Sequence, residues 1–399
     1  MNKPISVEEA DKLITTALYS PVSEACDLSE ATNRVLAEDI TADRDFPPFH
    51  RVAMDGIAIR YDDFHNGCRT FTIQGVQPAG NPPQILEERY TCVEVMTGAV
   101  LPIGADTVIR YEDLNRVDDQ FDIVVEDIRP KQNVHHQGTD QKIGDILLPA
   151  GKYISPADVG ILATVGKHQV QVHSLPKIAI ISTGDELVDV SETPMPHQIR
   201  KSNVHVLSSF LRQLGMTADS FHLNDELNSI RNQLPGLIAD YDVLLLSGAV
   251  SKGKFDHLPD VLLENGIRPE FHGVQQRPGK PFWFGRNDHT TVFAFPGNPV
   301  STTLCAVRYF IPWFKQSMGI PSQPVQIELG SDVYFKPALT YFVPIELRME
   351  HHKLIGIPHP GHGSGDLANL TRADGFVELP AGQEHHHAGN LYPFHGWRG

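Results

Sequence analysis

The chain has 399 residues, of which 41% are hydrophobic and 21% are charged. This composition is typical of a soluble globular protein and excludes a disordered or fibrous chain. The length predicts several domains, because a single core rarely extends past about 250 residues. The 33 basic and 49 acidic side chains give a formal net charge of -16, which disfavours nucleic acid and anionic membranes as partners.

Cysteine usage and the first residues indicate a reducing compartment. The four cysteines are far apart and form no CxxC pair, so we expect reduced thiols and no zinc site built from Cys26, Cys68, Cys92 and Cys305. Residues 1–13 lack the apolar core of a signal peptide, and no later apolar run approaches the ~20 residues that span a bilayer. We therefore expect a cytoplasmic protein.

The N-terminal part predicts helices around a β-rich insertion. A serine cap, an acidic first turn and helical spacing predict a helix over residues 6–18, and a second short helix is expected from Ser29. Two prolines within residues 44–50 end regular structure and suggest a boundary. Short β-branched segments separated by turns predict strands near residues 72–76, 92–96, 107–111 and 121–125. Helical spacing returns at Pro156–Thr164.

From residue 177 onward, strand-like and helix-like segments alternate as in a doubly wound parallel sheet. The last ~80 residues hold short apolar stretches separated by glycine-rich and histidine-rich turns, which suggests a β-barrel or sandwich. The predicted fold is therefore an α/β multidomain protein. Its four expected domains are a discontinuous first domain, an inserted β-rich domain, the α/β domain and a C-terminal barrel, at residues 1–45 with 133–176, 46–132, 177–319 and 320–399.

Three predicted strands end in unusual loops that combine glycine with polar residues. Ligands of open parallel sheets bind beyond the carboxyl ends of the strands, so backbone amides in these loops are candidates for holding phosphate. Asn298 followed by Pro299 is typical of a helix cap and first helical position. Any one of these loops alone is more readily explained as a tight turn, but three of them on one sheet edge favour an anion site. The loops contain Thr183, Gly184, Asp185 and Glu186; Ser247, Gly248 and Ser251; and Pro296, Gly297, Asn298 and Pro299.

Charged residues near the same sheet edge suggest an anion site with a metal ion. The segment Arg277-Pro278-Gly279-Lys280-Pro281 holds two cations in a constrained turn, although such turns are also common on surfaces. Carboxylates beside a bound phosphate are expected to require a hard cation such as Mg²⁺. The acids that follow predicted strands are Asp185, Glu186, Asp225 and Asp256. The P-loop, dinucleotide-fold and hydrolase-elbow motifs are absent.

Several histidines resemble metal ligands in type but lie in predicted turns of a polar surface. Ligand histidines normally come with matched spacing and acidic partners, so we interpret these as surface residues. They are His351, His352, His359, His362, His385, His386 and His387.

Over nearly its whole length the sequence resembles the molybdopterin molybdenumtransferases, the MoeA and gephyrin E-domain family. Two N-terminal motifs carry the likeness: Phe46-Pro47-Pro48-Phe49 with Ala53-Met54-Asp55-Gly56, and Met96-Thr97-Gly98-Ala99 followed by Pro102 and Gly104-Ala105-Asp106. Further similar segments follow in the same order, at residues 182–187, Ser202-Asn203, 247–251 with Asp256, 278–281 and 296–301.

The resemblance implies an elongated four-domain subunit with an α/β domain like that of the single-domain enzymes MoaB and MogA, and a homodimer with transient contacts to other proteins of molybdenum cofactor biosynthesis. It implies insertion of molybdenum from molybdate into adenylated molybdopterin, with Mg²⁺ and release of AMP. By position, the catalytic residues would be Asp55, Thr97, Glu186, Asp225, Asp256 and Lys280, of which Glu186, Asp225 and Asp256 would hold metal. The substrate-binding residues would be Thr183, Gly184, Asp185, Ser202, Asn203, Ser247, Gly248, Ser251, Arg277, Gly279, Pro296, Gly297, Asn298, Pro299 and Ser364.

Several positions depart from the family pattern. Val52 replaces a usual serine, Ala249 replaces the second glycine of a Ser-Gly-Gly loop, and His135, His136 and Thr139 replace arginines and a glutamate. Histidine is mostly uncharged at neutral pH, so His135 in place of an arginine would weaken contacts with an anionic ligand. Two alternatives therefore stay open: a molybdopterin adenylyltransferase, and a gephyrin-like binding scaffold with weakened catalysis. The sequence leaves the choice between molybdate and tungstate open.

Overall fold

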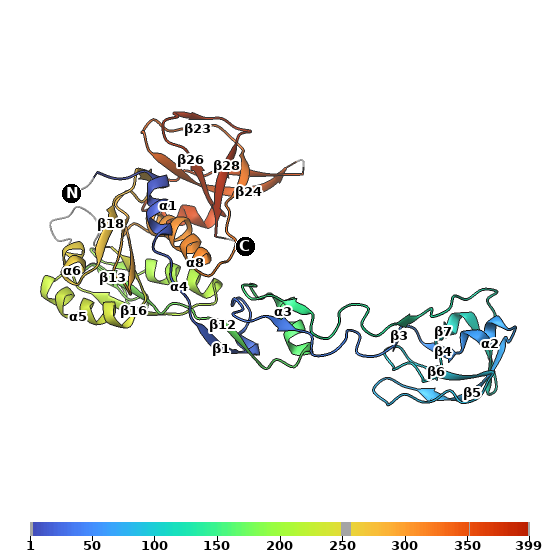
Figure 1. The fold of residues 1–399 in the computed structure, drawn as a ribbon. Coiled ribbons are helices and arrows are strands. Elements are labelled where there is room, and N and C mark those ends of the chain that lie inside the picture. The colour runs from blue at the N-terminus through green and yellow to red at the C-terminus, as the bar shows by residue number, and fades with distance from the viewer. Residues whose placement is uncertain (1–2, 249–256, 351, 398–399) are drawn as a thin grey trace. The chain divides into compact units, whose positions relative to one another are not determined.

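The computed structural model describes residues 3–248, 257–350 and 352–397, and the chain divides into two compact units (Figure 1). Unit 1 contains residues 1–26, 30–37 and 171–399, and unit 2 contains residues 27–29 and 38–170. In the described ranges, no helix has both the length and the apolar character needed to cross a membrane.

A six-stranded sheet with the order β7-β4-β6-β5-β9-β8 forms the centre of unit 2. Its strands are β4 (Gly56–Ile59), β5 (Thr70–Gln77), β6 (Thr91–Val95), β7 (Thr107–Arg110), β8 (Leu114–Val117) and β9 (Gln120–Ile123). Every residue of the central strands β4 and β6 is buried, because apolar clusters cover both faces of the sheet there. The β-rich character predicted for this stretch is therefore present.

The rest of unit 2 consists of short elements. Two-stranded pairs join β2 (Ile40–Thr41) to β11 (Ile146–Leu148) and β3 (Arg51–Val52) to β10 (Val134–His135). The helices are α2 (Tyr61–His65) and α3 (Pro156–Thr164), and α3 has the bounds predicted from its spacing.

The N-terminal helix α1 (Val7–Thr15) begins with a capping box, in which the Glu9 amide donates to Ser6 Oγ at 3.1 Å. The second short helix expected from Ser29 is wrong. Only a three-residue 3₁₀ turn forms over Leu28–Glu30, and Asn33 then adopts a left-handed conformation with φ 67°, which an α-helix cannot contain. Strand β1 (Ser23–Asp27) pairs with β12 (Gln169–His173).

The α/β domain contains a sheet with the order β16-β13-β17-β21-β20-β18. The strands are β13 (Ile178–Thr183), β16 (Ala218–Leu223), β17 (Val243–Ser247), β18 (Arg268–His272), β20 (Trp283–Arg286) and β21 (Thr291–Phe295). The first four in the sheet are parallel, as predicted, whereas β20 runs antiparallel to both of its neighbours, β21 and β18. A four-residue connection between β20 and β21 explains the difference, because so short a loop can join only antiparallel neighbours.

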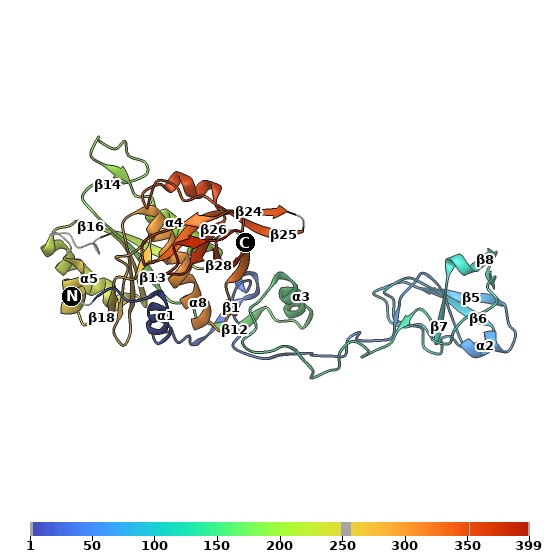
Figure 2. The ribbon, with the colours of Figure 1, turned by 90° about the horizontal axis from the view of Figure 1, so that it is seen from above.

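Helices cover both faces of this sheet (Figures 1 and 2). Helices α5 (Leu227–Asp240) and α6 (Leu258–Glu264) pack on one face against alternate residues of β13 and β17. Helix α4 (Asn203–Gln213) contacts β13 and the helix α7 (Pro299–Cys305), which contacts β21. The long helix predicted from Pro299 continues through a π-helical turn (Ala306–Phe310) into α8 (Ile311–Ser317), and Pro312, which has no N–H to donate, follows that turn.

The C-terminal residues form a closed five-stranded barrel with the order β24-β25-β22-β28-β26, completed by pairing of β24 with β26. The strands are β22 (Val325–Leu329), β24 (Thr340–Glu350), β25 (Lys353–Pro358), β26 (Gly375–Leu379) and β28 (Leu391–Gly396), and β19 (Gln276–Arg277) from the α/β domain pairs with β24. Closure gives every strand of the barrel a hydrogen-bonded neighbour on both sides, and inward-facing apolar residues fill the interior. The predicted barrel is confirmed.

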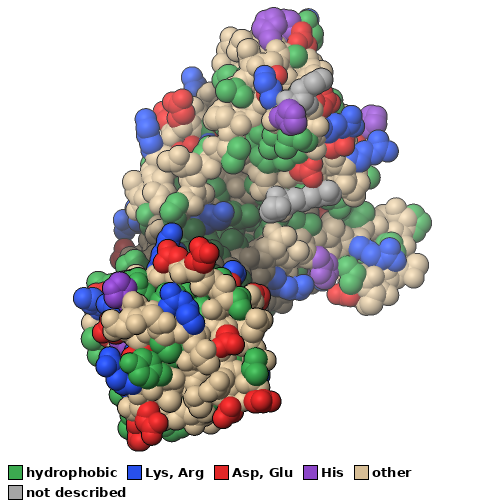
Figure 3. Space-filling view, turned by 90° about the vertical axis from the view of Figure 1, so that its right-hand side faces the viewer, with side chains coloured by type: hydrophobic (Ala, Val, Ile, Leu, Met, Phe, Trp, Pro, Cys, Tyr) green, Lys and Arg blue, Asp and Glu red, His purple; other side chains and the backbone are tan. Residues whose placement is uncertain are grey.

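Charged side chains of both signs lie on the face drawn in Figure 3. On the face drawn in Figure 3, acidic and basic side chains are interspersed and do not gather into one large patch of a single sign. A local anion site is compatible with the net charge of -16, because long-range repulsion is weakened by ions and by nearby cations.

Candidate functional site

A cavity of about 490 Å³ lies beyond the carboxyl ends of the parallel strands β13, β17 and β21. This is where loops of an open parallel sheet converge, so the position agrees with the sequence-based expectation. Of the predicted site residues, the cavity brings together Thr183, Gly184, Glu186, Ser202, Asn203, Asp225, Ser247, Gly248, Pro296, Gly297, Asn298 and Pro299.

Asn203, the first residue of α4, joins two of these loops. Its Nδ2 donates to Ser247 Oγ and to the backbone oxygen of Gly297, both at 2.8 Å. Gly248 approaches closely here: its φ is +103°, and a Cβ at this position would lie 2.8 Å from Thr183 Oγ1. A side chain would therefore separate the loops, which explains why glycine is required.

Two polar atoms in this cavity wall are buried without a hydrogen-bond partner in the described structure, Thr183 Oγ1 and Asn203 Oδ1. A buried oxygen without a partner costs about 1–3 kcal/mol, so native proteins rarely leave one unsatisfied without a functional reason. Both residues line the cavity, so a polar ligand bound there is a candidate partner for these two atoms.

The predicted acids occupy different places. Glu186 and Asp225 line the cavity, whereas Asp185 lies outside its wall and accepts a hydrogen bond from the Asp225 amide at 3.3 Å. Asp256 and Ser251 lie outside the described residues. The carboxylate oxygens of Glu186 and Asp225 are ligands that Mg²⁺ prefers. The donor chemistry therefore fits a hard divalent cation.

A second cavity of about 910 Å³ lies between the α/β domain and the barrel, both in unit 1. It shares Pro281, Pro296 and Asn298 with the first cavity. The remaining predicted site residues in its wall are Arg277, Gly279, Lys280 and Ser364. The two cavities therefore adjoin at the loop before α7.

Asn298 connects the two domains and does not cap its own helix. It occupies the N-cap position of α7, but its side chain makes no cap hydrogen bond, and its Nδ2 donates to Ser364 Oγ at 2.9 Å. The Val300 amide also donates to the backbone oxygen of Ser364 at 3.1 Å. The predicted N-cap position of Asn298 and first helical position of Pro299 are therefore confirmed, but the Asn298 side chain bonds to the barrel loop and not to its own helix.

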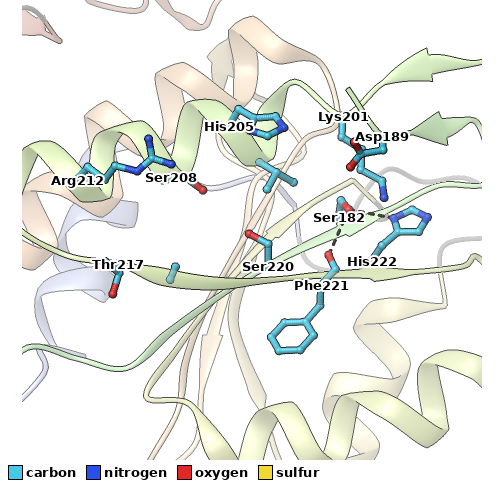
Figure 4. A pocket seen from close by; sticks show the side chains of 12 residues that line it. Ser182, Asp189, Lys201, His205, Ser208, Arg212, Thr217, Ser220, Phe221 and His222 are labelled. Atoms are coloured by element: carbon cyan, nitrogen blue, oxygen red, sulfur yellow. Dashed lines mark hydrogen bonds between the residues drawn. The ribbon is translucent and has the colours of Figure 1, made fainter. Parts of the chain in front are cut away.

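A third cavity, of about 450 Å³, lies between α4 and the edge strand β16 and shares Ser182 and Lys201 with the first (Figure 4). Ser182 Oγ lies 3.0 Å from His222 Nδ1, and burial, followed by the charge of Lys201, lowers the pKa of that histidine. Lys201 was missed in the sequence analysis. Its place directly before the Ser202-Asn203 pair was the available signal, and it forms no salt bridge within the described part of the chain.

Asp55 and Thr97 lie in unit 2, where they bond to each other. The amide and the hydroxyl of Thr97 donate to Asp55 Oδ1 at 2.6 and 2.8 Å, and these bonds lower the pKa of Asp55. The two family-like motifs that contain them therefore form one local arrangement, with an ionised carboxylate held by its neighbour.

The departures from the family pattern have local structural roles. His135 lies between Arg51, at 3.0 Å from Nδ1, and Asp140, at 2.9 Å from Nε2. Val52 is fully buried in an apolar cluster of unit 2. Thr139 donates from its hydroxyl to the backbone oxygen of His136 at 2.7 Å. Ala249 lies outside the described residues.

Comparisons with known proteins give matches along the chain. Residues 5–166 match the family model for the MoeA N-terminal region (domains I and II), residues 179–316 match a probable molybdopterin binding domain, and residues 326–395 match the MoeA C-terminal region (domain IV). The chain is 38% identical to a molybdopterin molybdenumtransferase from Synechocystis sp., covering 98% of this chain and 100% of the relative.

Other similar proteins come from archaea. A putative molybdopterin biosynthesis protein from Methanocaldococcus jannaschii is 30% identical, covering 96% of each chain. The crystal structure of a molybdopterin biosynthesis MoeA protein from Pyrococcus horikoshii OT3 has a TM-score of 0.81 at 28% identity, covering 99% of this chain and 100% of that one. Because a full-length relative exceeds 30% identity and the family models follow one another along the sequence, this chain belongs to the molybdopterin molybdenumtransferase family.

Proposed function

We propose that this protein inserts molybdenum from molybdate into adenylated molybdopterin and releases AMP. The observation that supports this proposal best is the cavity at the carboxyl ends of β13, β17 and β21. In this member of the family, the cavity brings together carboxylates, hydroxyls and glycine-containing loops. The curated relatives are named for the transferase, and this favours the transferase over an adenylyltransferase or a scaffold.

In this proposal Glu186 and Asp225 hold Mg²⁺, together with Asp256, for which the family resemblance is the only support. Both described carboxylates line the cavity, and their oxygens suit a hard cation. When bound, the ion would neutralise charge on phosphate and oxyanion groups.

The remaining roles follow from position. Thr183 and Asn203 offer unpaired oxygens to the polar part of the substrate, and Lys201 supplies a cation at the border of two cavities. Lys280 stabilises the negative charge that grows on the departing phosphate, because a fixed cation acts most strongly where charge develops. The Asn298–Ser364 hydrogen bond keeps the barrel loop against the substrate loop.

The part played by Asp55 and Thr97 in the same reaction stays a prediction from the resemblance. We propose that Asp55 acts as a carboxylate, because the bonds from Thr97 lower its pKa and keep it ionised at neutral pH.

The test is release of AMP from adenylated molybdopterin incubated with the purified chain, Mg²⁺ and molybdate, followed by chromatography. We expect release only when molybdate is present. Tight binding of the substrate without release would contradict the transferase and favour a scaffold, and consumption of ATP without molybdate would favour the adenylyltransferase.

A further inference from the structure

A compact group of two histidines and one aspartate lies on a short antiparallel ribbon beside the barrel. Strand β23 (Val333–Tyr334) pairs with β27 (His385–His386), with Val333 opposite His386 and Tyr334 opposite His385. Continuing this register places Asp332 opposite His387. Figure 1 labels β23 in this region.

The alternation of side chains along the ribbon separates the three consecutive histidines. His386 points inward: it has no exposed surface, and its ring lies 5.8 Å from that of Tyr392. Residues two apart in a strand share a face, so His385 and His387 both point outward. The expectation that these histidines lie in turns was wrong for His385 and His386, because a two-residue strand shows no periodicity in the sequence.

The outward-facing atoms are close enough to share one ion. His385 Nε2 lies 2.7 Å from Asp332 Oδ2, and the rings of His385 and His387 have centroids 3.8 Å apart. One ligand atom from each of the three residues lies within 4.8 Å of the other two. Donors on a tetrahedral zinc ion are about 3.3 Å apart for bonds of roughly 2.0–2.1 Å, so small rotations of exposed side chains are sufficient.

Neighbouring groups already orient two of the three ligands. The Ala388 amide donates to Asp332 Oδ1 at 2.8 Å and leaves Oδ2 directed at the histidines. The ring of Tyr334 stacks on His385 with centroids 4.1 Å apart and an interplanar angle of 16°. Such supporting contacts commonly fix the ligands of metal sites.

We propose that Asp332, His385 and His387 form a binding site for one divalent transition metal ion of the zinc class. Imidazole suits such ions, whereas Mg²⁺ prefers oxygen ligands, so this ion is chemically distinct from the one proposed for the cavity lined by Glu186 and Asp225. Three protein ligands at a partly exposed position leave at least one coordination place to water. None of the three residues lines the cavities described above.

The experiment is titration of the metal-stripped full chain with ZnCl₂ by isothermal calorimetry. We expect one site per chain that is lost or weakened at least about tenfold in His387→Gln and in Asp332→Asn, since even supporting residues of metal sites are worth 10–100-fold. His289→Gln, which replaces an exposed histidine of the same unit, should bind zinc like the unmodified chain.

Thermal unfolding provides a second measurement that does not depend on heats of binding. The same concentration of Zn²⁺ should raise the Tm of the unmodified chain and of His289→Gln by more than that of His387→Gln, because a ligand stabilises a fold according to how tightly it binds. Circular dichroism of each variant without metal checks that it is folded. Absence of zinc binding, or equal binding by the unmodified chain and His387→Gln, would overturn the proposal. Neither result depends on transferase activity.

Discussion

Single residues decide how the loops of the cavity come together. Thr183, Asn203 and Gly248 make the contacts described above because each is small or polar where two loops meet. Thr183 and Gly248 were predicted as site candidates because strand ends followed by glycine and hydroxyl residues are recognisable, whereas Asn203 was predicted only from the family resemblance. It did not predict Lys201, whose place in the wall depends on the pairing of β14 (Leu187–Val188) with β15 (Ile199–Arg200) just before it.

The interaction of Asp55 with Thr97 can be tested at this scale. Replacement of Thr97 by Val removes the hydroxyl donor and leaves the backbone N–H, so the pKa of Asp55 should rise but stay below its ordinary value. The pKa is measured by carbon-detected NMR titration. Thr70→Val, which removes a 2.6 Å bond to Asp122 in the same unit, should leave Asp55 unchanged. An unaltered Asp55 titration in Thr97→Val would refute this account.

Elements with a strong pattern were predicted well. The apolar runs of β13, β17 and β21 and the apolar stripes of α1 and α4 are continuous in the sequence, so element type follows from periodicity. Strand direction at the β18 and β20 edge was not predicted, because it depends on a connection length and on which neighbour each strand finds. The ribbon of β23 and β27 was missed because its strands are two residues long.

A partly buried ion cluster joins the π-helical turn to the barrel and to α1, and it predicts a stability effect. Arg308, 11% exposed, donates to Glu378 at 2.9 Å and to both oxygens of Asp11 at 2.8 and 2.7 Å. Arg308→Met leaves Glu378 buried without this partner, so the free energy of unfolding at pH 7 should fall by about 3 kcal/mol.

Denaturant unfolding measures this change. Burial raises the pKa of Glu378, but the contacts with His395 and Arg308 lower this pKa by more than burial raises it. The pKa of Glu378 therefore lies below its ordinary value of 4.5. The ionised Glu378 carboxylate therefore stabilises the fold above about pH 4.5, and this contribution to the free energy of unfolding is lost as the pH falls below that value. Arg348→Met, which breaks an exposed pair with Glu346, should change stability by less than about 1 kcal/mol. Equal effects of the two substitutions would show that the cluster does not stabilise the fold.

At the scale of the whole molecule, assembly is a proposal from the family resemblance. We propose a homodimer that makes transient contacts with other proteins of molybdenum cofactor biosynthesis in the cytoplasm. Sedimentation velocity at micromolar concentration should give about twice the 44.2 kDa mass of the chain. A single species at 44.2 kDa over the same concentrations would contradict the dimer. The division into four domains also stays a prediction.

The proposed function places molybdenum transfer in the cavity at the carboxyl ends of the parallel strands. The most direct measurement compares the rate of molybdate-dependent AMP release by the unmodified chain, Glu186→Gln and Glu192→Gln. Glu186 lines the cavity, whereas Glu192 is exposed and lies outside its wall. We expect a loss of at least about 100-fold for Glu186→Gln, typical of a lost electrostatic contact in a reaction site, and an unchanged rate for Glu192→Gln. Full turnover by a folded Glu186→Gln variant would contradict the proposal.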